Sequence, residues 1–127
     1  MKPVYDTVDI RAYNALANRL LIDAVNSLKR LPAKLTRASN TILNRTVETP
    51  IEELWWARCC IHESCIQLNN EIRFIESAAF ENLCTALDIN AARAYAALKR
   101  KYARKRREAL SLADEAEKTY INFLENK

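Results

Sequence analysis

The sequence predicts an all-α protein, a bundle of four to five helices in a single domain that spans residues 1–127. Glycine is absent, although β-hairpins, bulges and positive-φ turns commonly require it. Alanine, leucine, lysine, arginine and glutamate, which are good helix formers, are abundant, and half of the residues are hydrophobic. Proline occurs only at positions 3, 32 and 50, each a plausible break between elements.

The first helix is expected to begin after Asp9, with Thr7 as an alternative cap, and to end before Pro32. Its apolar residues recur at the i, i+3, i+4, i+7 spacing of one helix face; they are Ile10, Tyr13, Leu16, Ala17, Leu20, Leu21, Ala24, Val25 and Leu28. The segment 33–49 is rich in threonine and asparagine, which weaken helices. We therefore expect a short helix or an ordered loop there.

The second helix is predicted to begin with a capping box formed by Thr49 and Glu52, with Pro50 in its first turn, and to end near Asn70. Its apolar residues cover more than one face, which is typical of a central buried helix. These apolar residues are Trp55, Trp56, Cys59, Cys60, Ile61, Ile66 and Leu68.

Two further helices are predicted around a turn at residues 88–90. Ser77 is expected to cap residues 78–87, and Asn90 to cap a long C-terminal helix over residues 91–124. The apolar face of this helix repeats in nearly heptad steps, through Ala91, Tyr95, Leu98, Tyr102, Ala109, Leu112, Ala116, Tyr120 and Phe123. Such a helix outruns a domain of this size, which predicts a homodimer packed mainly through residues 109–124. The alternative is that the N-terminal helix covers this face within one chain.

Charge is strongly sorted along the chain. Residues 51–90 carry a net charge of −5, whereas residues 91–107 hold eight basic and no acidic residues. At about 100° per residue, Arg93, Arg100, Arg104 and Arg107 fall opposite the apolar face, and Lys101 and Lys105 flank them. The candidate nucleic-acid-binding residues are Arg93, Lys99, Arg100, Lys101, Arg104, Lys105 and Arg107. A face of one sign repels itself without a partner, so we expect a polyanion such as nucleic acid. The alternative partner is the acidic segment 51–90, in the same chain or another.

The stretch "FENLCTALDINAARAYAALKRK" resembles the general helix-turn-helix pattern of bacterial and phage proteins over residues 78–101. Leu83 and Cys84 occupy the early apolar and small positions, Asp88 replaces the usual turn glycine, and Ile89 follows as the apolar turn residue. At the start of the second helix only Arg93 is suited to a bidentate guanine contact. That composition indicates weak sequence specificity.

A second resemblance rests on "ANRLLIDAVNSLKRL" and "FIESAAFENLCTALDIN", which are similar to segments of small helical phage and prophage proteins, some of them transcription regulators. Together these features predict a DNA-binding regulator, with DNA favoured over RNA and paired modules meeting paired half-sites. The competing hypothesis is a protein-binding adaptor or inhibitor whose basic face docks on an acidic partner. An electrophoretic shift at two salt concentrations distinguishes the two.

No motif indicates an enzyme, a cofactor or a metal site. The cluster "CCIHESC" suggests metal ligands, but Cys59 and Cys65 lie about 120° apart on one helix, so with Cys60 and His62 they do not close on one ion. The four cysteines are expected to be buried thiols in a reducing compartment. The chain has no apolar run long enough to span a membrane and no apolar leader, so a cytoplasmic location is expected.

Overall fold

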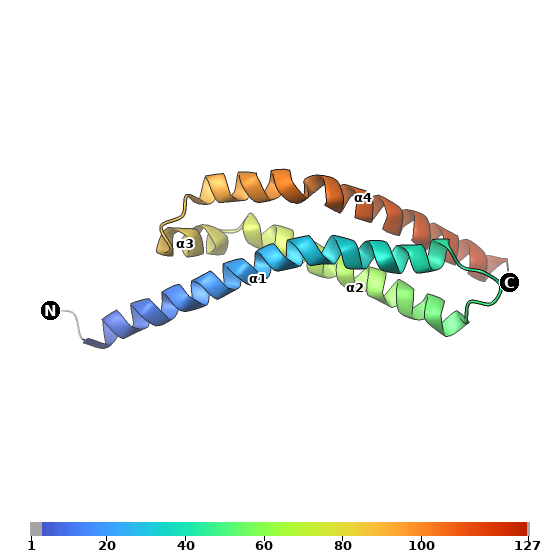
Figure 1. Ribbon diagram of the computed structural model, residues 1–127, viewed down its shortest axis with the longest axis horizontal. Coiled ribbons are helices and arrows are strands. Elements are labelled where there is room, and N and C mark those ends of the chain that lie inside the picture. Colours follow the sequence, from blue (N-terminus) through green and yellow to red (C-terminus); the bar gives the residue numbers. More distant parts are fainter. Residues whose placement is uncertain (1–3, 127) are drawn as a thin grey trace.

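The computed structural model describes residues 4–126, and the side chains of residues 11–126. Four helices follow one another along these residues (Figure 1): α1 (Val4–Leu43), α2 (Ile51–Ile75), α3 (Ala78–Ala86) and α4 (Ala91–Glu125). No strand occurs in residues 4–126. The predicted all-α class is therefore confirmed, and the four helices fall within the predicted four to five.

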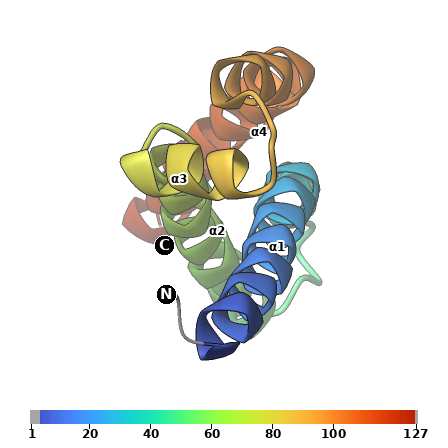
Figure 2. The same ribbon diagram turned by 90° about the vertical axis from the view of Figure 1, so that its left-hand side faces the viewer.

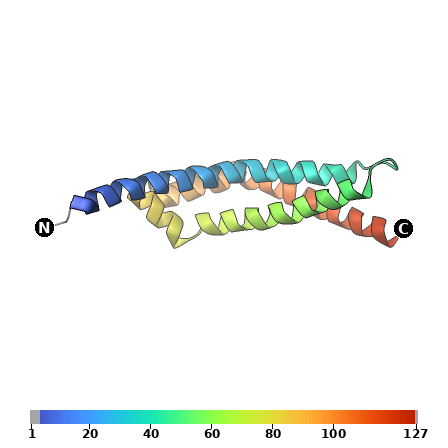
Figure 3. The same ribbon diagram turned by 90° about the horizontal axis from the view of Figure 1, so that it is seen from below.

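The three long helices form an elongated bundle in which α1 packs along both α2 and α4. Seen along the bundle, α3 lies crosswise to them near one end (Figure 2). Figure 3 shows α2 beside the second half of α1, while the first half of α1 continues past it. The central helix is therefore α1.

Helix α1 is longer than predicted at both ends, and the expected break at Pro32 is wrong. It begins at Val4, so neither Thr7 nor Asp9 is its cap, and it continues through Pro32 to Leu43. An internal proline removes one helical hydrogen bond and costs about 3 kcal/mol. Burial offsets this cost, because Leu35, Ala38 and Ile42, beyond the proline, continue in register the buried face to which Leu28 and Leu31 belong. Residues 33–43 are thus helical, and only 44–50 form a connection.

Helix α2 begins at Ile51 without the predicted capping box. Pro50 occupies the N-cap position and no side chain caps the helix, because the Thr49 hydroxyl instead accepts a hydrogen bond from the Thr46 N–H at 3.0 Å. The helix ends at Ile75 rather than near Asn70. Only one face of α2 is buried, and its residues include Leu54 and Ile61.

The prediction that α2 is buried on several faces is also wrong. Trp55 is 49% exposed and Trp56 is 66% exposed, and Ile66 on the same outer side is exposed as well. The sequence contains enough apolar residues for two faces of α2, but its buried residues, which include Leu54, Ile61 and Leu68, form a single stripe.

The α3–α4 connection forms as predicted. The Ser77 hydroxyl accepts a hydrogen bond from the Phe80 N–H at 3.3 Å, and the Asn90 side-chain carbonyl accepts one from the Arg93 N–H at 3.0 Å. Between the helices Asp88 has a φ of 56°, in the left-handed region that aspartate tolerates at some cost. Helix α3 ends one residue earlier than expected, and α4 spans the predicted range to within one residue.

Replacing Asp88 with glycine is expected to stabilise the protein by up to about 1 kcal/mol, because glycine adopts a positive φ without the Cβ clash. Urea denaturation of the wild type and of Asp88→Gly measures the difference. Thr85→Gly, a change inside α3, is the control and should lose roughly 0.3 kcal/mol, the difference between the helix propensities of threonine and glycine. Equal losses in the two variants would contradict the left-handed turn.

The apolar face of α4 is covered within the chain. Ala109, Ala113, Ala116 and Tyr120 are buried against residues of α1 and α2 that include Leu35 and Leu54. The small alanine side chains allow the helices to approach closely. The face expected to pair with a second copy is thus packed on the extended second half of α1, so the physical reason for a dimer through residues 109–124 no longer holds.

An ion pair joins α2 to α4 at this end of the bundle. The Arg58 guanidinium donates to the Glu117 carboxylate, with Nη2 at 2.6 Å from Oε1 and Nε at 3.1 Å, and it stacks over the Tyr120 ring at 4.8 Å. His62 Nε2 lies 3.3 Å from the other carboxylate oxygen of Glu117. The hydrogen bond that Glu117 accepts from Arg58 keeps the pKa of the Glu117 carboxyl below its ordinary value of 4.5.

Glu117→Gln is expected to lower the free energy of unfolding by about 1 kcal/mol at neutral pH, because it leaves Arg58 without its charged partner. The folded-state pKa of Glu117 lies below its unfolded value, so this stabilisation is present above pH 4.5 and is lost as the pH falls through the lowered pKa. Urea denaturation at several pH values should show the two proteins converging in acid. The control is Glu115→Gln, which removes an exposed carboxylate and should give no pH-dependent difference.

The cysteines are free thiols, and only Cys84 is fully buried; Cys59, Cys60 and Cys65 are partly buried. Burial raises the pKa of the Cys84 and Cys65 thiols. The expectation of four buried thiols is therefore correct for one and too strong for three. The described residues contain no group of three or more His, Cys, Asp or Glu side chains placed to hold a metal ion.

Candidate nucleic-acid interface

All seven predicted binding residues lie on α4, and all seven are exposed. The helix is fixed along its inward side by Tyr102, which is buried, and by Tyr95 and Leu98, which are partly buried. From Arg93 to Arg107 the face extends about 21 Å at 1.5 Å per residue. Duplex DNA presents on the order of a dozen phosphates over that length.

These seven side chains are called the basic face. Few acidic side chains among residues 11–126 pair with it. Its members are Arg93, Lys99, Arg100, Lys101, Arg104, Lys105 and Arg107. One member, Arg104, forms an ion pair, with Glu108 at 3.0 Å, and both side chains are largely exposed. Lys99 and Lys101 lie over the rings of Tyr95 and Tyr102 at 5.7 and 5.5 Å. The acidic segment 51–90 makes no ion pair with the basic face. Within residues 11–126, pairing with the acidic segment is thus not what balances the charge of the basic face.

The connection that leads into α4 matches only part of the predicted helix-turn-helix packing. Leu83 and Cys84 are buried as expected, and Ala94 and Leu98 are partly buried. Ile89, expected to pack inward at the turn, is 43% exposed. Around the first turns of α4, Ala92, Arg93 and Ala96 are exposed, so Arg93 is the only one of these side chains able to donate hydrogen bonds to a base.

Arg106, the eighth basic residue of segment 91–107, was not among the predicted binding residues. It is partly buried and lines a cavity between α2 and α4. The sequence does indicate that Arg106 points inward. It follows the apolar-face residue Tyr102 by four positions, so the two lie on the same side of the helix. The cavity itself depends on how α2 packs against α4, which periodicity does not specify.

No helix within residues 4–126 combines the length and apolar character required to cross a bilayer. No protein-family model, curated protein or solved structure matches this chain.

Proposed function

We propose that this protein is a nucleic-acid-binding regulator of the phage or mobile-element type that holds the phosphate backbone of duplex DNA with the basic face of α4. One observation carries the proposal: seven exposed basic residues share one helix, and only one of them has an acidic partner among the described side chains. Backbone neutralisation by such a face supplies most of the affinity of non-specific binding. The α3–α4 unit orients the face, and Arg93 is the residue placed for a base contact.

DNA is favoured over RNA because of the shape of the binding element. A single exposed helix fits the wide major groove of B-form DNA, whereas the major groove of A-form RNA is too deep and narrow for it. The proposal does not require pairing through residues 109–124, because that face is covered within one chain.

A gel-shift or anisotropy titration with a roughly 20-base-pair DNA duplex and a matched RNA duplex tests the proposal, at several salt concentrations between about 50 and 200 mM. The expected slope of log K against log salt is about −4 to −6 for DNA, since each neutralised phosphate contributes roughly −0.9. Absence of binding at the lowest salt, combined with salt-sensitive binding to an acidic polypeptide, would instead support the adaptor or inhibitor that docks on an acidic protein.

A further inference from the structure

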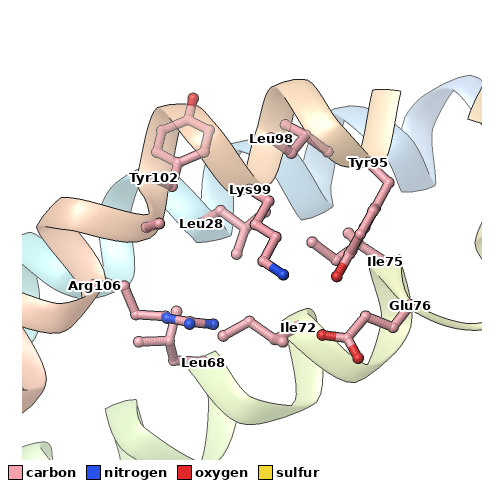
Figure 4. A pocket seen from close by; sticks show the side chains of 11 residues that line it. Leu28, Leu68, Ile72, Ile75, Glu76, Tyr95, Leu98, Lys99, Tyr102 and Arg106 are labelled. Carbon is pink, nitrogen blue, oxygen red and sulfur yellow. The ribbon is translucent and has the colours of Figure 1, made fainter. Parts of the chain in front are cut away.

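A partly open cavity of about 130 Å³ lies between α2 and α4. Its floor and walls are apolar and come from three helices (Figure 4), through Leu28, Leu68, Ile72, Ile75, Leu98 and Tyr102. An apolar cavity of about 150 Å³ accommodates a benzene ring. This space is slightly smaller but partly open, so it suits one six-membered ring or a branched chain of similar size with its polar end at the opening.

Two cationic groups are directed into this space. Figure 4 shows the Lys99 amino group and the Arg106 guanidinium converging on it from α4, with the Tyr95 hydroxyl and the Glu76 carboxylate at its other side. Arg106 Nε is buried and has no hydrogen-bond partner among the described residues. Neither cation forms an ion pair with Glu76. A buried donor without an acceptor is destabilising, and an incoming anionic oxygen would satisfy it.

We propose that the α2–α4 cavity is a binding site for a small aromatic monocarboxylate, whose ring packs on Leu68 and Ile72 while its carboxylate accepts hydrogen bonds from Arg106 and Lys99. The formal charge of the lining groups is +1, from two cations and Glu76, so a monoanion neutralises it. A dianion such as a phosphate monoester would meet the Glu76 carboxylate and would leave the apolar walls uncovered. The site shares Lys99 with the basic face, but its tests measure carboxylate binding in the absence of nucleic acid.

Benzoate is the probe, and benzamide, of nearly the same shape but uncharged, is its matched control. We expect benzoate to shift the amide resonances of residues that line the cavity in ¹⁵N-labelled full-length protein, with a dissociation constant near or below about 1 mM, the strength expected of a ligand with few atoms. Benzamide should bind at least about tenfold more weakly, because it leaves the cations without a counter-charge. Equal binding of the two compounds, or shifts outside the cavity, would overturn the proposal.

Substitutions in the cavity test which side chains contact the benzoate carboxylate. Arg106→Gln should weaken benzoate binding by about tenfold or more while leaving benzamide unchanged, because it removes one charge-assisted contact. Arg73→Gln is the matched control, since Arg73 is an exposed arginine on α2 that does not line the cavity; its benzoate affinity should equal that of the wild type. Circular dichroism checks that each variant keeps its helix content. Lys99→Gln provides a second test, and wild-type affinity in both the Arg106 and Lys99 variants would reject the site.

Discussion

Replacing Arg100, Arg104 and Arg107 together with alanine is expected to weaken DNA binding by roughly 10²–10³-fold near 0.1 M salt and to reduce the slope of log K against log salt by about three units. The three side chains are exposed on the outer side of α4, so they contribute to phosphate contacts and not to the core. Alanine is the best helix former, and the substitutions should leave α4 intact. Anisotropy titrations at several salt concentrations give both quantities.

The control is a second triple variant, Lys29→Ala, Arg37→Ala and Arg73→Ala, which removes the same formal charge from exposed positions on α1 and α2. Its effect should be much smaller, because screening at about 0.1 M salt limits exposed charges to a range of roughly 10 Å. Equal losses in the two variants would indicate a response to net charge alone. Unchanged affinity and slope in the α4 variant, with the fold intact, would contradict the proposed interface and favour the acidic protein partner.

The elements that sequence patterns predicted well are those that local interactions determine. Ser77 and Asn90 each cap a helix by accepting a hydrogen bond from a residue three positions along, and Asp88 adopts the positive φ of the turn. These interactions involve neighbours within a few residues, so the sequence around each site contains the information. The exposure of the basic face followed in the same way from its position opposite the apolar stripe.

The features that sequence patterns missed depend on contacts between distant segments. The cost of Pro32 in α1 is local, but the burial that offsets it comes from packing on α2 and α4. The exposure of Trp55 likewise depends on which side of α2 the other helices cover. The cavity at Arg106 requires residues 68–76 of α2 to face residues 95–106 of α4, and no periodicity within either helix specifies that register.

Leu35→Ala is expected to lower the free energy of unfolding by about 3–5 kcal/mol, the largest effect of any single substitution proposed for this protein. Leu35 is 0% exposed, in the part of α1 that follows Pro32, and it belongs to the buried cluster that contains Ala109 and Ala113. The alanine side chains of α4 are too small to fill the space that the missing methyl groups leave. The cavity should therefore persist, and the loss should fall in the upper part of the range for leucine-to-alanine changes.

Urea denaturation followed by circular dichroism measures this loss, and Arg37→Ala is the control because Arg37 is exposed in the same stretch of α1. The control should change stability by less than about 0.5 kcal/mol. A loss of less than about 1 kcal/mol for Leu35→Ala would mean that the helix beyond Pro32 does not pack against α2 and α4. The apolar face of α4 would then lack its cover, and the argument against a dimer through residues 109–124 would fail with it. A large loss supports the extended α1 as the element that buries this face within one chain.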